Sequence, residues 1–214
     1  MTRGGIVAAA LTAGGMFLSP RLDAHRLDEY LQATRLSVAL DRIELEIDLT
    51  PGVSIAERIV TAIDTDRDGR FSPAESDAYA GTVLNALALT ADGRALPLNP
   101  GDQSFPDRGA MLEGVGTIRL RASAMLPRTS GGRHTIEYRN GYQPEASVYL
   151  ANTLVPGNRR ITIAAQDRDP LQHRLTVTYD ITYSRSRRTG AVAASLAVVL
   201  IVMGRRKRAT ARPA

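Results

Sequence analysis

Apolar and polar residues alternate along much of the chain, which is typical of strands that have one face on a core and the other in water. The clearest run is 43–49, in which isoleucines and leucines alternate with acidic residues. Strands are expected at 36–40, 43–49, 116–126, 134–140, 146–151, 160–165 and 174–183, with a hairpin turn at 91–94. Turn residues separate these short runs, so the pattern predicts a mainly β fold, an antiparallel β-sandwich.

Two segments follow a helical period instead. Residues 54–63 place isoleucines on one face at 55, 59 and 63, and Ser54 and Glu57 have the spacing of a capping box. A second helix is expected over 73–87, because Pro73 suits a first turn and apolar residues at 79, 83, 84 and 87 share a side. We therefore expect a helix–loop–helix insert at 54–87, and a loop at 98–109.

The two ends of the chain carry membrane signals. Residues 1–24 have an arginine, an apolar run and a short polar piece, which is typical of a signal peptide, although an uncleaved N-terminal anchor is an alternative. Residues 189–204 contain no charge after Thr189 and precede a basic tail at 205–214, which predicts a C-terminal transmembrane helix. A buried core helix is the alternative for that run.

This organisation predicts a single-pass protein of the bacterial inner membrane, with its main domain, 25–184, in the periplasm or outside the cell. A bacterial source is indicated by Lys207 being the only lysine of the 27 basic residues. Another class fits the same ends: a structural surface protein whose C-terminal helix and basic cluster form a sorting signal that is removed.

Charge is distributed unevenly between these parts. Ten of the 27 basic residues but only one of the 22 acidic residues lie outside 25–184, which leaves 17 basic and 21 acidic residues there and a net charge of −4. Nucleic-acid binding by the exported part is therefore disfavoured, despite the whole-chain charge of +5. Cysteine is absent, which excludes disulfides and thiolate metal sites.

The stretch DTDRDGRFSPAE, residues 64–75, lies between the two expected helices and has acidic residues at its first, third, fifth and twelfth positions. Ca²⁺ takes six to eight oxygen ligands, which a 12-residue loop supplies at alternate positions. The ligands are expected to be the side chains of Asp64, Asp66 and Asp68, the backbone carbonyl of Arg70, Ser72 directly or through water, and both oxygens of Glu75. Gly69 is expected to adopt a positive φ, and Phe71 to anchor the loop on its helices.

This loop resembles an EF-hand. It departs from that pattern because an aromatic residue, Phe71, replaces the usual aliphatic one, Ser76 follows Glu75 where an apolar residue is common, and no second loop pairs with it. The alternative is a solvated turn in which Ser72 and Glu75 form a helix capping box. Four carboxylates in one loop repel each other, and that repulsion favours Ca²⁺ as the cofactor.

A longer stretch, including "HRLDEYLQATRLSV" at 25–38 and the strands at 147–181, resembles the extracytoplasmic domain of bacterial nickel/cobalt transporters of the HupE/UreJ type. The resemblance implies a membrane metal transporter, or another envelope protein, as partner. The expected spanning segment contains no ionisable residue, so the chain is not itself such a transporter. The function expected is a calcium-binding, membrane-anchored accessory module, and the alternative is a domain that handles Ni, Co or Cu while calcium serves only the fold.

A terminus without metal is the main expectation for His25, and a second metal site there is the alternative if the signal peptide is cut after Ala24. The α-amino and ring nitrogens of a terminal histidine suit Cu(II) or Ni(II). No catalytic residues are expected, because the three histidines are not paired in any motif spacing and no G-x-S-x-G sequence occurs. The chain is therefore expected not to be an enzyme.

Overall fold

A computed structural model describes residues 29–128, 130–143 and 145–183. Within these residues, ten strands and three helices follow one another along the chain. They are β1 (Tyr30–Val38), β2 (Arg42–Pro51), α1 (Val53–Ile63), α2 (Pro73–Asn85), β3 (Leu87–Ala91), β4 (Arg94–Ala95), β5 (Asn99–Ser104), α3 (Arg108–Leu112), β6 (Ile118–Met125), β7 (Gly132–Asn140), β8 (Ser147–Thr153), β9 (Ile161–Arg168) and β10 (Arg174–Ile181).

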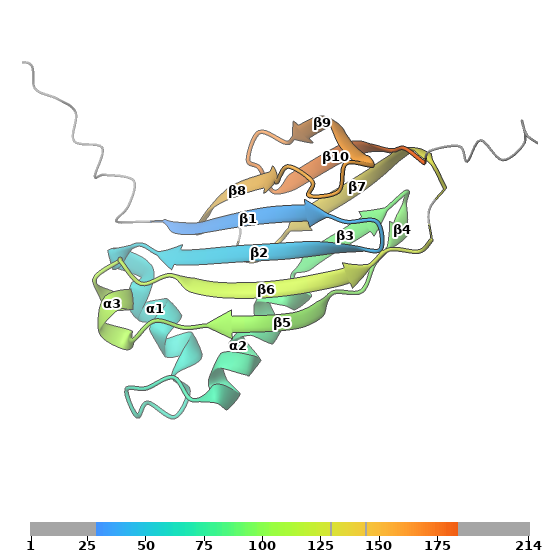
Figure 1. Cartoon of the computed structure of the whole chain (residues 1–214). Helices are drawn as coiled ribbons and strands as arrows, with labels where there is room; N and C mark the ends of the chain where they lie inside the picture. The colour runs from blue at the N-terminus through green and yellow to red at the C-terminus, as the bar shows by residue number, and fades with distance from the viewer. Residues whose placement is uncertain (1–28, 129, 144, 184–214) are drawn as a thin grey trace, which may run out of the picture.

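The strands form two five-stranded sheets, with the orders β5-β6-β2-β1-β8 and β4-β3-β7-β10-β9. Figure 1 shows the sheets as two layers, with α1 and α2 beside them. The fold is thus mainly β with two sheets, as expected. One pairing departs from the antiparallel expectation: β8 runs parallel to β1, with Tyr30 opposite Ser147.

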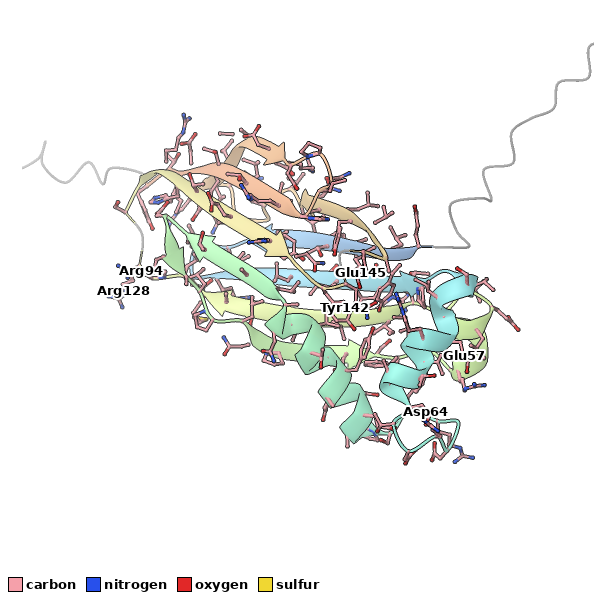
Figure 2. The ribbon with its side chains drawn as sticks, turned by 180° about the vertical axis from the view of Figure 1, so that it is seen from behind. Glu57, Asp64, Arg94, Arg128, Tyr142 and Glu145 are labelled. Atoms are coloured by element: carbon pink, nitrogen blue, oxygen red, sulfur yellow. The ribbon has the colours of Figure 1, made fainter. Side chains whose placement is uncertain are left out.

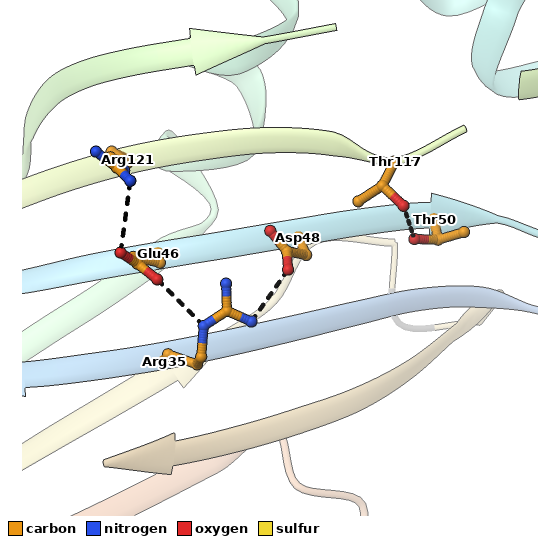
Figure 3. Close-up of polar contacts among 6 residues, drawn as sticks. All are labelled: Arg35, Glu46, Asp48, Thr50, Thr117 and Arg121. Carbon is orange, nitrogen blue, oxygen red and sulfur yellow. Dashed lines mark hydrogen bonds and ion pairs between the residues drawn. The ribbon is translucent and has the colours of Figure 1, made fainter. Parts of the chain in front are cut away.

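Alternation along the strands builds one core between the sheets. Ile43, Leu45, Ile47 and Leu49 of β2 are almost fully buried, as are the apolar residues of β10 in the other sheet. The intervening acidic residues face water, where Arg35 of β1 donates to Glu46 at 3.2 Å and to Asp48 at 3.0 Å (Figure 3). The predicted wet face of this hairpin is confirmed.

The two expected helices are present, with different ends. The N-cap of α1 is Gly52 and no side chain caps it, so the capping box expected from Ser54 and Glu57 is wrong. Glu57 instead pairs with Arg108 of α3 at 3.2 Å. The second helix, α2, ends at Asn85, and Leu87 begins β3. Residues of α2 contact β3 and β5, one strand from each sheet, so this helix covers an open side between the layers.

The expectation of a loop at 98–109 is also wrong. Residues Asn99–Ser104 form β5 on the edge of the first sheet, paired with β6. Their side chains are almost all exposed, so no apolar alternation marks the strand. After it, Asp107 caps α3 by accepting from the Ala110 amide at 2.8 Å, and Met111 of α3 is fully buried.

Several expectations lie outside the described residues: the signal peptide at 1–24, His25, the transmembrane helix at 189–204 and the tail at 205–214. None of the helices in the described ranges has the length and apolar character needed to cross a membrane.

Candidate metal centre

The loop between α1 and α2 is fixed at both ends. Asp64 is the C-cap of α1, and its amide donates to the carbonyl of Val60 at 2.8 Å. At the other end, Ser72 is the N-cap of α2 and forms a capping box with Glu75, followed by Pro73 in the first turn. The alternating aspartates therefore start from a rigid helix end, which limits where their carboxylates can go.

Three aspartates converge in this loop. One carboxylate oxygen from each of Asp64, Asp66 and Asp68 lies within 4.8 Å of the others. Each side chain also accepts one backbone hydrogen bond, from Gly69 at 3.1 Å, Asp68 at 3.1 Å and Arg70 at 2.8 Å, respectively. These bonds wrap the backbone around the carboxylates and orient them toward one point.

Asp64 differs from the other two in its burial. It is 6% exposed, whereas Asp66 and Asp68 are exposed. Its Oδ1 atom is buried and has no hydrogen-bond partner among the described residues. A buried carboxylate oxygen without a donor is unfavourable, and a cation in the loop would satisfy it. Figure 2 shows Asp64 where α1 enters the loop.

The backbone turns left-handed twice within the loop. Gly69 has φ +83°, as predicted, and no atom lies within 4 Å of the position its Cβ would take. Glycine is therefore favoured there by conformation and not by space. Arg67 has φ +62°, which the sequence did not indicate.

Glu75 takes a different position from the one expected of a bidentate ligand. Its Oε1 accepts from the Thr65 amide at 2.6 Å and the Asp66 amide at 3.3 Å, and its Oε2 accepts from the Ser72 amide at 3.0 Å and hydroxyl at 2.8 Å. These bonds, first that from the Ser72 amide, lower the pKa of Glu75 to about 2. Glu75 thus links the two ends of the loop and is not among the three converging carboxylates.

Of the remaining expected ligands, the Ser72 hydroxyl is engaged in other bonds: it donates to Glu75 and accepts from the Glu75 amide. The Arg70 amide donates to Asp68, whereas the ligand atom expected of Arg70 is its carbonyl. Phe71 is partly buried against the core and contacts Phe105 edge-on with ring centroids 6.3 Å apart. Phe71 thus holds the loop against the core, and its predicted packing on the two helices stays a prediction. Thr65, which donates to Glu75 through both its amide and its hydroxyl, was not indicated by the sequence.

The group of Asp64, Asp66 and Asp68 could hold a metal ion. Carboxylate oxygens are hard ligands, which suit hard divalent cations better than soft ones. The geometry does not distinguish among those cations.

No protein-family model matches the chain, and no curated protein or solved structure matches it. The resemblances to an EF-hand and to transporter-associated domains therefore remain hypotheses from the sequence.

Proposed function

We propose that the protein binds Ca²⁺ in the loop 64–75 and acts as an extracytoplasmic binding or accessory module anchored in a bacterial inner membrane. The observation that carries the calcium proposal is the buried, unpartnered Oδ1 of Asp64 within a group of three carboxylates. The anchor is supported by the uncharged run that ends at Gly204 and the basic residues after it. Outside the cytoplasm such a loop would meet calcium at concentrations that suit a weak site.

Calcium binding would rearrange the hydrogen bonds of Glu75, the last residue of the loop. Asp64, Asp66 and Asp68 supply three oxygens without moving far, because their backbone bonds already orient them. Glu75 becomes a ligand only if it releases the amides of Thr65 and Ser72. This exchange and the lack of a second loop both favour a weak affinity, roughly 10⁻⁵ to 10⁻³ M.

The test is a calcium titration of the full chain in detergent by calorimetry and thermal unfolding. Calcium at about 100 times its dissociation constant should stabilise the fold by about 2.7 kcal/mol. Asp66→Asn should abolish this effect, since it removes one charged ligand but keeps an oxygen for the Asp68 amide. Asp167→Asn is the matched control, because Asp167 is exposed on β9.

Mg²⁺ should stabilise the chain less than Ca²⁺, because it requires a tighter octahedral site. Absence of binding heat together with an unchanged melting temperature at millimolar calcium would favour the capping-box interpretation and end the proposal.

A further inference from the structure

The two ends of the sandwich are chemically different. The described part of the chain ends at Tyr183. The end of the sandwich at which Tyr183 lies is the exit end. Register places its parts together: Ile181 lies opposite Gly132 and Ile161, and Arg42 lies opposite Met125. The exit end comprises the turns 39–41 and 92–94, residues 125–128 and 130–133, the segment 154–160 and Tyr183 (Figure 1).

Arginines dominate the exit end. Arg94, Arg128, Arg159 and Arg160 are exposed, and none forms a salt bridge with a carboxylate in the described part of the chain. The acids of these turns are already engaged: Asp41 with Arg42, and Asp92 with His134. The exit end therefore presents unneutralised positive charge.

Two of these arginines share a hollow. Arg94 and Arg128 line a depression of about 300 Å³ together with Asp92, Ser130 and His134. Figure 2 shows both arginines at the end of the molecule opposite Asp64. Both ring nitrogens of His134 face acceptors, Asp92 Oδ2 at 2.8 Å and the Ser130 carbonyl at 3.0 Å, so a ring that donates to both is protonated and offsets the charge of Asp92. The two guanidinium groups then supply the net charge of this hollow.

Apolar side chains project beside the arginines. Val155 is 93% exposed, Met125 59% and Tyr183 46%. The Arg160 guanidinium lies 5.9 Å from the centroid of the Tyr183 ring. Arginine and tyrosine next to protruding aliphatic groups are typical of surfaces at the headgroup level of a bilayer.

The opposite end carries the loop 64–75, in which four acidic residues outnumber two arginines, Arg67 and Arg70. An anionic surface would thus attract the exit end and repel the loop. These two forces would orient the molecule on the surface without specific contacts.

We propose that the exit end docks on an anionic phospholipid surface. The expected membrane segment lies close to this end in the sequence, which favours lipid over an acidic protein as the partner. Its uncharged run begins at Gly190, seven residues after Tyr183. A linker of that length spans at most about 25 Å, so an inserted run would keep this end near the headgroups. The inference rests on the proposed membrane attachment and is independent of calcium.

The absence of cysteine allows a direct test in the full chain. Single cysteines at Val155 and, as a control at the opposite end, at Leu171 are labelled with a polarity-sensitive fluorophore. The chain is reconstituted into phosphatidylcholine vesicles with or without phosphatidylglycerol, and quenching by headgroup-labelled lipid is measured. We expect quenching at Val155 to be stronger with phosphatidylglycerol than without it, and quenching at Leu171 to be weak in both.

Charge variants separate docking from attachment. Replacing Arg94 and Arg128 by Gln should lower the docked-to-free ratio by about fivefold per arginine. The same change at Arg119 and Arg139, which are exposed toward the opposite end, should leave the ratio unchanged.

Flotation with the vesicles reports attachment independently. Chain that floats but shows equal quenching at both labels would overturn the docking proposal and leave the anchor intact. Quenching at Val155 that depends on the arginines but is equal with and without phosphatidylglycerol would overturn the assignment to anionic lipid. Chain that does not float even with phosphatidylglycerol would overturn both the docking and the attachment.

Discussion

At the scale of a single residue, Glu75 belongs to both interpretations of the loop: it is an expected calcium ligand and a member of the helix capping box. Its two oxygens accept from both ends of the loop and from the N-cap Ser72, so it stabilises the loop without metal. We predict that Glu75→Gln lowers the melting temperature by several degrees even in a chelator, because a glutamine has only one acceptor oxygen. Glu137→Gln, on the exposed face of β7, should have no effect on the same measurement.

The pH dependence of this effect follows from the lowered pKa of Glu75. A depressed pKa means that the ionised group stabilises the folded state above its unfolded value of 4.5 and that this contribution is lost as the pH falls toward about 2. The difference in melting temperature between the wild type and Glu75→Gln should therefore be constant above about pH 5 and shrink below pH 4.5. A difference that persisted unchanged at pH 2 would show that Glu75 acts by packing.

Two buried tyrosine hydroxyls allow a matched comparison. The hydroxyls of Tyr79 and Tyr30 bond to each other at 2.8 Å, whereas the Tyr179 hydroxyl is buried with no hydrogen-bond partner in the described structure. Tyr79→Phe should lower the free energy of unfolding by roughly 1–3 kcal/mol, because it leaves the Tyr30 hydroxyl unpaired. Tyr179→Phe should be neutral or stabilising in the same denaturant titration. Equal losses in both variants would contradict this difference.

At the scale of elements, one histidine ties the β3–β4 turn to β7. Its ring nitrogens both face acceptors: His134 Nδ1 is 2.8 Å from Asp92 Oδ2, and Nε2 is 3.0 Å from the Ser130 carbonyl. The hydrogen bond with Asp92 is the main cause of a raised pKa of His134. Burial acts to raise the pKa of Asp92, but bonds from His134 and the Thr135 amide lower it overall. Both ring nitrogens can donate to these acceptors only when the ring is protonated, so the contacts stabilise the charged pair.

This contact predicts a defined pH window. The contribution of His134 is complete below its unfolded pKa of 6.5 and is lost as the pH rises through its raised value, and that of Asp92 is present above 3.8 and lost at lower pH. Asp92→Asn should lower the His134 pKa in an NMR titration and destabilise the fold most between about pH 4 and 6.5. His173, which contacts Tyr149, serves as an internal reference. An unchanged His134 pKa in the variant would refute the coupling.

Most of the strands that the sequence predicted alternate in burial, although β9 does not. The run 43–49 has one face in the core and one in water, so its period appears in the residue types. In contrast, β5 has exposed side chains and an irregular register between Pro100 and Gln103, so apolar burial contributes little to its pairing with β6. The parallel contact of β8 with β1 was also missed, because periodicity does not identify the neighbour of a strand.

The same limit applies to the metal site. The spacing of Asp64, Asp66 and Asp68 and the positive φ of Gly69 follow from local sequence, and both agree with the geometry. The burial of Asp64 depends on how α1 packs against distant elements, which local sequence does not encode. Glu75 fits both the calcium pattern and the capping box, and only the fold shows that the capping box is formed.

At the scale of the whole molecule, the acidic loop 64–75 and the basic exit end lie at opposite ends of the sandwich. If the chain is anchored beyond Tyr183, the loop faces away from the membrane, toward whatever partner the module contacts. Calcium would then change the charge of the distal end without weakening attraction of the exit end to the bilayer. The ten residues of β2 run between the two ends and span about 33 Å, which exceeds the Debye length of about 8 Å at physiological salt.

This arrangement requires that the chain crosses the membrane after Tyr183, with its last residues inside. We predict that a reporter active only outside the cytoplasm works when fused after Tyr183 and fails when fused after Arg208. The basic run Arg205–Arg208 favours this orientation, but three arginines at 185, 187 and 188 oppose it. Replacing Arg205–Arg208 by glutamines should therefore make the reporter fused after Arg208 active in some molecules. The same change at the arginines at 185, 187 and 188 should leave that reporter inactive. Activity of the unaltered second fusion and inactivity of the first would reverse the topology and remove the loop from the compartment in which calcium is plentiful.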